Sequence, residues 1–271
     1  MHSERLDAIP RYLYSHGASS IQALADAIGA SLATVRRDLQ VLEQQGIISR
    51  THGGARIANS AEVEVAFAVR EKQNLFEKRA IGAAAYELLK PHSSVFLDAG
   101  TTVLQLARCL RVRPLPLAVF TNGLIAAQEL MNIPKLMVSV IGGQVRNENA
   151  SLVGPAAEAA LDRLWFDQLF LGASAIGDDN RIYGLDAAEA HLNAQMRSRA
   201  ANTTVLTDSS KFGRRATHVV CDLDNSISII TDDELSPDWQ ADLRENGAKL
   251  SVVHSFATPG SPDRIAAGES A

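Results

Sequence analysis

The sequence predicts an α/β protein, in which a small N-terminal unit of helices and one hairpin precedes a larger unit built on a mainly parallel sheet. Residues 20–56 carry two closely spaced helix signals and then a hairpin signal. From residue 78 onward, short apolar strands alternate with amphipathic helices. We therefore divide the chain into a first domain at 1–58, a linker at 59–76, a second domain at 77–257 and a tail at 258–271, which we expect to be disordered.

The composition is that of an ordinary globular protein, with 271 residues of which 46% are hydrophobic and 21% charged. No run approaches the roughly 18–20 apolar residues that span a bilayer, and the N-terminus lacks the pattern of a signal peptide. We therefore expect a cytoplasmic protein. Cys109 and Cys221 lie far apart in apolar stretches, so we expect two buried packing residues and no disulfide. The seven histidines are scattered without ligand spacing, and we expect neither a metal site nor a cofactor.

The net charge is −5, which argues against nonspecific binding of polyanions. Residues 1–58 hold six arginines against five acidic residues, a net charge of +1 that leaves −6 for the rest. Any contact with nucleic acid must therefore come from the local placement of these arginines.

Between Ser20 and Gly46, two helix signals with a short break form the arrangement of a helix-turn-helix. Ser20 is an N-cap candidate for the first helix, and Gly29 can take the left-handed conformation that ends it. Ser31 is the corresponding cap of the second helix. The buried stripe of that second helix is predicted by four apolar residues at intervals of three and four: Leu32, Val35, Leu39 and Leu42.

The opposite face of the second helix carries residues suited to a DNA groove. At 100° per residue, Arg37 and Thr34 point nearly away from the apolar stripe, with Ala33 beside them and Arg36 on a flank. Arginine can donate two hydrogen bonds to a guanine edge, so Arg37 ranks first for base contact and Arg36 for phosphate. We expect Asp38 to orient an arginine. The alternative is a solvated face that carries two arginines by chance.

The segment after Gly46 predicts a short strand, a Gly53–Gly54 turn and a returning strand, which together form a wing. Its polar residues are placed to meet the sugar-phosphate backbone or minor groove, although an ordinary polar hairpin would look similar. The candidate DNA contacts are Ser31, Ala33, Thr34, Arg36, Arg37, Arg50, His52 and Arg56.

In the second domain we predict six strands of a sheet covered on both sides by helices, one of them at Val103–Leu110. The strands are Ser94–Leu97, Leu117–Phe120, Leu136–Ile141, Gln168–Leu171, Thr203–Leu206 and Ser226–Ile230.

Small and polar residues follow the carboxyl ends of these strands, where ligands bind in open α/β sheets. Gly100 lets the backbone approach a ligand closely, and Thr101 and Thr102 add donors at a helix N-terminus. Lys211 supplies a full charge, so the pattern favours a phosphate. Taken alone, such a turn could be only a well-capped connection. The segments are Asp98–Thr102, Thr121–Gly123, Gly142–Gly143 with Arg146 after it, and Asp208–Lys211.

Both halves of the chain resemble the DeoR family of bacterial transcription regulators. Thr34–Leu39 (TVRRDL) and Arg50–Ala55 (RTHGGA), with Leu42 and Gly46, carry the resemblance in the first domain. The order of the four polar segments carries it in the second, and together they cover about residues 3–235. The resemblance implies a winged helix-turn-helix and a Rossmann-like domain similar to the ribose-5-phosphate isomerase group. Pro10 is a departure, because a helix starting near Ser3 must then start late or kink.

The resemblance also implies that a phosphorylated sugar or related metabolite binds to the second domain. Glu189, in Ala188–Ala190, is similar to the acidic helix start of the family. Arg181–Gly184 departs from the usual glycine and threonines, and Asn193 and Ala194 replace residues that are often basic, so the ligand identity stays open. The implied effector positions are Asp98, Gly100, Thr101, Thr102, Asn122, Gly143, Glu189 and Lys211.

The leading functional prediction is a transcription regulator that binds double-stranded promoter DNA and is not an enzyme. We expect a repressor, since a protein bound to the promoter blocks polymerase. A homodimer or higher homo-oligomer is expected because one recognition helix contacts only a few base pairs. The alternative is a sugar-phosphate isomerase-like enzyme with an accessory DNA-binding domain, with Asp98, Glu189 or Asp208 as base. Against it, Gly172–Asp178 lacks the paired acids of those isomerases. A third possibility is a module that binds another protein.

Overall fold

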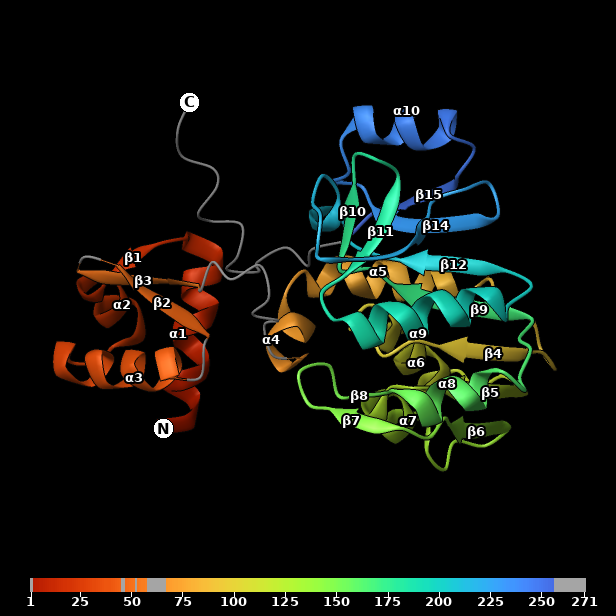
Figure 1. Cartoon of the computed structure of the whole chain (residues 1–271), viewed down its shortest axis with the longest axis horizontal. Helices are drawn as coiled ribbons and strands as arrows, with labels where there is room; N and C mark the ends of the chain where they lie inside the picture. The colour runs from red at the N-terminus through yellow and green to blue at the C-terminus, as the bar shows by residue number, and fades with distance from the viewer. Residues whose placement is uncertain (1, 45–46, 52, 58–66, 256–271) are drawn as a thin grey trace. The chain divides into compact units, whose positions relative to one another are not determined.

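The structure, a computed structural model, describes residues 2–44, 47–51, 53–57 and 67–255 (Figure 1). The chain forms two compact units, Met1–Lys72 and Gln73–Ala271. Part of the expected linker is helical, because α4 spans Phe67–Lys72 and α5 spans Leu75–Tyr86. Residues 58–66 and the expected tail at 258–271 lie outside the described residues. None of the described helices is long and apolar enough to cross a membrane.

The N-terminal unit contains the predicted helix-turn-helix and hairpin. Ser20 caps α2 by accepting a hydrogen bond from the Ala23 N–H at 3.1 Å, and Gly29 ends that helix at a φ of +67°. Ser31 accepts one from the Thr34 N–H at 3.2 Å at the start of α3. The elements are α1 (His2–His16), β1 (Ser19–Ser20), α2 (Ile21–Ile28), α3 (Leu32–Gln44), β2 (Ile48–Thr51) and β3 (Gly54–Ile57), with β3 antiparallel to both β1 and β2.

The first three helices and the hairpin bury one apolar core. Val35, Leu39 and Leu42 are buried as predicted, but Leu32 is 38% exposed, so its assignment to the buried stripe was wrong. Leu32 is the first residue of α3, and its side chain leans toward the N-terminal end of the helix, beyond the core. The core residues are Ile9, Leu13, Leu24, Ala25, Val35, Leu39, Leu42, Ile48 and Ala55.

Pro10 lies inside α1, which already begins at His2, so of the two expected alternatives, a late start or a kink, the late start is ruled out. Proline has no N–H, and the carbonyl of Leu6 therefore loses its usual partner within the helix. Pro10 is buried beside Ile9 on the core side of α1, and this burial offsets part of the lost hydrogen bond.

The second unit is built on a seven-stranded parallel sheet of order β15-β14-β12-β9-β4-β5-β6. All six predicted strands belong to this sheet, and β15 extends it at one edge. Sequence reasoning missed the shorter strands that pair outside it. The strands are β4 (Ser94–Leu97), β5 (Leu117–Thr121), β6 (Leu136–Val140), β7 (Gln144–Arg146), β8 (Ser151–Val153), β9 (Gln168–Gly172), β10 (Ala175–Gly177), β11 (Arg181–Gly184), β12 (Thr203–Leu206), β13 (His218–Asp222), β14 (Ile227–Asp232) and β15 (Lys249–Val253).

Helices cover both faces of the sheet (Figure 1). On one face α5 packs against α6, which in turn packs against α7, and on the other α8 packs against α9. The central strands β9 and β12 are almost wholly buried, as expected for a sheet covered on both sides, whereas the edge strands β6 and β15 are partly exposed. The remaining helices are α6 (Val103–Val112), α7 (Leu124–Leu130), α8 (Pro155–Leu161), α9 (Ala187–Ser198), the 3-10 turn η1 (Ser209–Lys211) and α10 (Pro237–Glu245).

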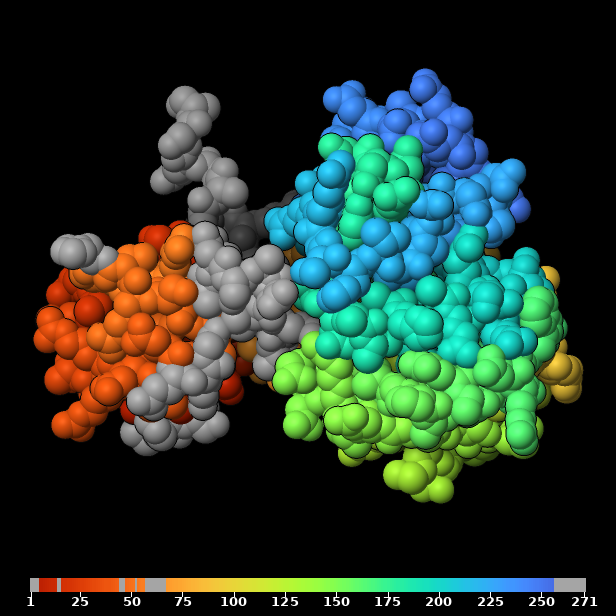
Figure 2. Space-filling model, in the orientation of Figure 1, coloured from red at the N-terminus to blue at the C-terminus, as the bar shows by residue number. Residues whose placement is uncertain are grey.

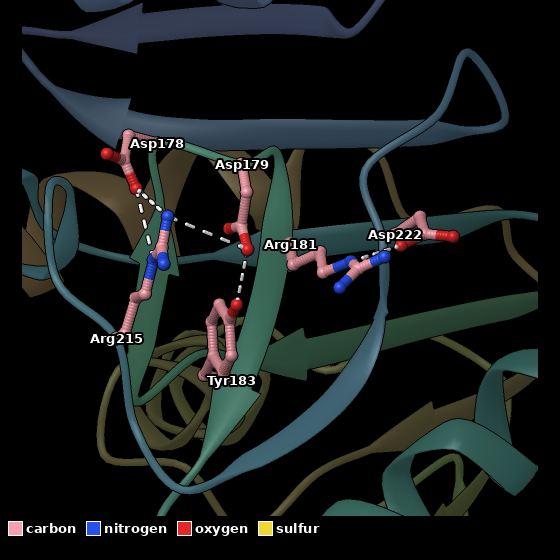
Figure 3. A network of polar contacts seen from close by, with 6 residues as sticks. All are labelled: Asp178, Asp179, Arg181, Tyr183, Arg215 and Asp222. Carbon is pink, nitrogen blue, oxygen red and sulfur yellow. Dashed lines mark hydrogen bonds and ion pairs between the residues drawn. The ribbon is translucent and has the colours of Figure 1, made fainter.

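A small sheet of β10, β11 and β13 lies at the surface of the second unit (Figure 2). It contains the segment Arg181–Gly184, where this chain departs from the family pattern. Arg181 pairs with Asp222 at 3.0 Å, and the Tyr183 hydroxyl donates to Asp179 at 2.6 Å (Figure 3). Arg215 pairs with Asp178 at 2.6 Å. The departure thus belongs to a strand stabilised by surface polar contacts.

We expect Leu39→Ala to destabilise the N-terminal unit by about 2–5 kcal/mol, because it leaves a cavity in a closed core. Leu32→Ala, on the same helix but exposed, should cost less than about 1 kcal/mol. Urea unfolding followed by far-UV circular dichroism measures this. Both tryptophans, Trp165 and Trp239, lie in the second unit, so their fluorescence follows that unit separately. Equal effects of the two substitutions would contradict the assigned core.

Both cysteines are half-buried, whereas buried packing residues were expected. Burial nevertheless raises the pKa of Cys221 to about 11, and it raises the pKa of Cys109 against the opposing charge of Arg113. Because the thiolate is the reactive form, we expect both thiols to react more slowly with a disulfide reagent at pH 7.5 than they do in urea. A spectrophotometric rate assay tests this, and equal rates in the two conditions would contradict it.

Candidate DNA-binding and effector sites

The outer face of α3 presents Arg36 and Arg37, whose side chains are exposed and have no polar partner among the described residues. Ala33 is exposed beside them, and Thr34 is half-buried. The hydroxyls of Ser31 and Thr34 are hydrogen-bonded to each other at 2.8 Å. The two arginines are therefore available to a ligand, whereas Ser31 already caps the helix.

Asp38 is a buried carboxylate on the other side of α3, with 2% of its surface exposed. It accepts a hydrogen bond from Nε of Arg5 at 3.2 Å. Asp38 therefore does orient an arginine, but that arginine comes from α1. A buried carboxylate needs such a partner, and the pair fixes the recognition helix to α1.

The wing is attached to α3 through Arg50. Its guanidinium donates to the Arg36 carbonyl at 2.9 Å and pairs with Glu43 at 3.2 Å. Arg56 on β3 is half-buried, and His52 lies outside the described residues. Arg50 thus holds the wing against the helix that carries Arg36 and Arg37.

The two glycines of the wing turn have different roles. Gly53 has a φ of +81°, which glycine adopts without strain. A Cβ on Gly54 would lie 2.1 Å from the carbonyl oxygen of Ser19, so β3 can pair with β1 only if this position has no side chain.

In the second unit, the order of strands reverses between β4 and β9, where such sheets open a crevice at their carboxyl edge. Asp98, which follows β4, is 6% exposed and accepts a hydrogen bond from the Gly172 N–H at 3.0 Å. A Cβ on Gly100 would lie 3.3 Å from the Gly172 Cα. The loop after β4 is therefore hydrogen-bonded to the end of β9, and Gly100 and Gly172 place backbone without side chains on the two sides of this contact.

Thr101 and Thr102 lie at the start of α6, with Thr102 as its N-cap residue. Both are largely buried, and neither hydroxyl is hydrogen-bonded to another described residue. The first N–H groups of a helix lack partners within the helix and carry its positive dipole end. This turn can therefore donate hydrogen bonds to an anion.

The loop after β5 lies beside this turn. A Cβ on Gly123 would lie 2.9 Å from the Cα of Ala99, so only a glycine permits this approach. Asn122 is 1% exposed, and its carbonyl accepts the Leu152 N–H at 2.8 Å. Its side-chain Oδ1 has no hydrogen-bond partner among the described residues and can accept one from a ligand. Gly143 has a φ of +138° and packs against Val153 of β8.

Glu189 is held by the β7–β8 hairpin. It accepts hydrogen bonds from Asn149 at 2.9 Å and from the Ser151 hydroxyl, and it pairs with Arg146 at 3.3 Å. The N–H of Glu189 donates to Asp186, the cap of α9, at 3.0 Å. Since β8 also contacts the Asn122 loop, Glu189 belongs to the same edge of the sheet.

Lys211 lies in the turn after β12, three residues beyond Asp208, which is 1% exposed. Burial alone would raise the pKa of Asp208. The charges of Lys211 and Lys78 and the hydrogen bonds from Ser210 and Asn74 outweigh burial and lower that pKa. This turn therefore contains a buried ionised carboxylate next to a half-buried lysine.

The candidate effector residues thus form two connected groups along one edge. The loop after β4 is joined through Gly123 to Asn122, and β8 joins Asn122 to Gly143 and Glu189. On the other side, Gly172 pairs with Leu206 of β12, which leads into the Asp208–Lys211 turn. No sequence motif predicted that Asn74 and Lys78 act on Asp208, or that Asn149 and Ser151 donate hydrogen bonds to Glu189.

A cavity of about 380 Å³ lies elsewhere, between α5 and α6. Arg79, Tyr86, Cys109 and Arg113 are among its lining residues, and none of the predicted effector residues is. It is therefore separate from the edge where the polar loops converge.

Comparison with known proteins assigns both units. Residues 5–61 match the DeoR-like helix-turn-helix domain, and residues 73–233 match the DeoR C-terminal sensor domain. The chain belongs to the DeoR family. All candidate DNA contacts fall within the first match and all candidate effector residues within the second.

Relatives of this DeoR-family chain are similar over nearly their whole length. It is 36% identical to an Escherichia coli O157:H7 protein named for transcriptional repression of the aga operon, over 93% of this chain and 94% of that protein. It is 35% identical to the transcriptional regulator GlpR of Haloferax volcanii, over 94% and 98%. A solved ribose 5-phosphate isomerase A from Methanocaldococcus jannaschii covers 50% of this chain and 53% of its own, with 17% identity and a TM-score of 0.37. Likeness at that level says nothing about activity.

We expect Arg37→Ala to weaken specific DNA binding by about 1–3 kcal/mol and to relax base preference, because the free guanidinium faces away from the core. Arg163→Ala removes the same charge from an exposed position in the second unit and serves as the control. Gel-shift titrations on promoter and random DNA at fixed salt measure both effects. If Arg37→Ala weakens both DNAs equally, the assignment of Arg37 to base contact is wrong.

Proposed function

We propose that this chain is a cytoplasmic transcriptional repressor that binds double-stranded promoter DNA and is controlled by a phosphorylated sugar or related metabolite. The observation that carries the proposal is the convergence, at one edge of the sheet, of the Gly100 turn, the α6 N-terminus and the Lys211 turn. Relatives named as repressors support the direction of control.

The DNA-binding half of the proposal rests on α3 and the wing. Arg37 contacts base edges and Arg36 contacts phosphate, because both side chains are exposed and have no polar partner in the described part of the chain. Arg50 and Arg56 place the wing against the backbone or minor groove, and His52, which lies between them in the sequence, is proposed to contact the same DNA. In an acidic protein, these local charges supply the contact with the polyanion.

The effector half combines two kinds of chemistry. Backbone N–H groups at Gly100 and the α6 N-terminus, with the charge of Lys211, suit a phosphate. Asn122 and Glu189 offer oxygen acceptors to hydroxyl groups at the other end of the ligand. An anion with several hydroxyls, such as a phosphorylated sugar, satisfies both ends.

The carboxylates argue for sensing over isomerase chemistry. A general base works best when its pKa lies near the working pH. The pKa of Asp208 is lowered against the effect of its burial, and Asp98 and Glu189 accept hydrogen bonds from the protein. Each carboxylate is therefore engaged in holding the loops together.

Assembly as a homodimer or higher homo-oligomer completes the proposal. One recognition helix contacts only a few base pairs, and a second copy supplies another half-site. Analytical ultracentrifugation of the full chain, alone and on promoter DNA, tests this; a monomer bound to a single half-site would overturn it.

The proposal as a whole is tested by gel shift on the upstream regions of the gene, with a panel of sugar phosphates, and by a thermal-shift screen of the same compounds. A ligand that binds only the folded protein raises its melting temperature by mass action. Absence of saturable DNA binding at moderate salt would overturn the regulator, and absence of any stabilising sugar phosphate would overturn the effector class.

Lys211→Ala should leave the affinity for promoter DNA within about twofold of wild type. It should lower the affinity for the effector by about tenfold or more, since it removes a charged hydrogen-bond donor. Lys249→Ala, an exposed lysine on β15, controls for the loss of charge in the same unit. Gel shift and thermal shift together separate the outcomes. Loss of promoter binding in Lys211→Ala would mean that the lysine supports the fold instead of the effector.

A further inference from the structure

The helix that follows the boundary between the two units is tied to the proposed effector edge. The second unit begins at Gln73, and the next residue, Asn74, precedes α5. The side-chain Nδ2 of Asn74 donates to Oδ1 of Asp208 at 2.8 Å and to Oγ of Ser210 at 3.2 Å. The chain that arrives from the DNA-binding unit is thereby bound to the turn that carries Lys211.

Asp208 is the centre of these contacts. Its Oδ1 also accepts the N–H of Ser210 at 3.2 Å and the hydroxyl of the same residue. The lowered pKa keeps this buried group ionised, so the bond from Asn74 is charge-assisted. The Ser210 hydroxyl can donate one hydrogen bond, and it donates that bond to Asp208.

The face of α5 that carries Asn74 also reaches a second loop at the carboxyl edge of the sheet, the turn at Thr101. Asn74, Lys78 and Gly82 are spaced by four residues and therefore share that face. Lys78 is 2% exposed, and its charge acts on Asp208. A Cβ on Gly82 would lie 2.7 Å from the Cβ of Gln105, whose amide donates to the Thr101 carbonyl at 3.4 Å. The Asn74–Gly82 face thus contacts the Asp208 turn directly and the Thr101 turn through Gln105.

We propose that Asn74 positions the Asp208–Lys211 turn and links occupancy of the effector site to the DNA-binding unit. An anion bound at Lys211 accepts the hydrogen bond of the Ser210 hydroxyl in place of Asp208 and draws the turn away from Asn74. The arrangement with Asn74 bound to the turn binds operator DNA, and the effector prefers the arrangement without that contact. This inference rests on the proposed function, because it takes Lys211 as an effector residue.

The proposal has a reciprocal consequence. An effector that prefers one arrangement shifts the population toward it, and a change that favours the same arrangement must raise effector affinity. Removal of the Asn74 side chain therefore lowers operator affinity without any effector and strengthens the binding of an anion at Lys211.

The chain offers a matched pair of variants. Asn74 and Asn132 are both exposed and both have positive φ, +48° and +63°. Glycine keeps that backbone conformation while it deletes the carboxamide. The side chain of Asn132 has no hydrogen bond to another described residue. Asn132→Gly therefore controls for the backbone effect of Asn74→Gly.

Operator affinity of the full-length variants is measured by gel shift without phosphate, and inorganic phosphate binding by calorimetry. For Asn74→Gly we expect operator affinity at least threefold below that of Asn132→Gly, and phosphate affinity at least threefold above it. Operator affinity within twofold of Asn132→Gly overturns the proposal. The gel shift contains no effector, so its result does not depend on the effector class. If wild-type protein shows no phosphate binding in calorimetry, the proposed effector class is overturned. The gel-shift comparison of the two variants still decides whether Asn74 acts on DNA binding.

Ser210→Ala provides a second variant, which removes the bond from Asn74 to Ser210 and leaves the bond from Asn74 to Asp208 in place. We expect it to lower operator affinity by less than Asn74→Gly does, and the double variant to match Asn74→Gly, since Asn74→Gly already deletes the bond that Ser210→Ala removes. Fully additive effects would show that the two residues act separately and would overturn the proposal. Unchanged far-UV circular dichroism identifies the variants that fold.

Discussion

The hydrogen bond from the Gly172 N–H to the carboxylate of Asp98 is the interaction on which the proposed effector edge depends. It joins the ends of β4 and β9, the neighbours at which the strand order reverses. The loops on the two sides of a reversal diverge and leave a crevice at the carboxyl edge of the sheet. Here the nearly buried carboxylate of Asp98 joins the two loops, and Gly100 and Gly172 have no side chains there. The other polar loops take their positions by strand pairing outward from this point.

Charge pairing within the protein also determines which arginines of the DNA-binding unit are available to a ligand. Some of its arginines are used internally: Arg5 binds buried Asp38, and Arg50 pairs with Glu43. Arg36 and Arg37 keep their donors free within the described residues. In a protein with net charge −5, internal pairing concentrates the available positive charge on one face of one helix.

The polar atoms buried at the carboxyl edge form a consistent group. Asn122, Thr207 and Thr231 follow or end β5, β12 and β14, and each buries a side-chain oxygen without a partner among the described residues. A buried polar atom left unpaired costs about 1–3 kcal/mol. Atoms of this kind also occur away from the edge, at Asn193 and Gln195, but the three at the edge agree with a site that binds a polar ligand there.

The sequence alone determined the features that depend on neighbours in the chain. Ser20, Gly29 and Ser31 specify the helix ends, and the apolar runs specify six strands of the sheet, because caps and periodicity act over a few residues. The resemblance also indicated the family and the order of the polar loops. Which of those loops meet could be expected only from the general rule for parallel sheets.

The tertiary structure decided the contacts between residues far apart in the chain. The Arg5–Asp38 bond spans 33 residues and the Asn74–Asp208 bond spans 134, so no local pattern records either. The exposure of Leu32 and the hold of the β7–β8 hairpin on Glu189 belong to the same class. Periodicity assigns a side chain to a face of its helix, but burial and pairing depend on which distant element covers that face.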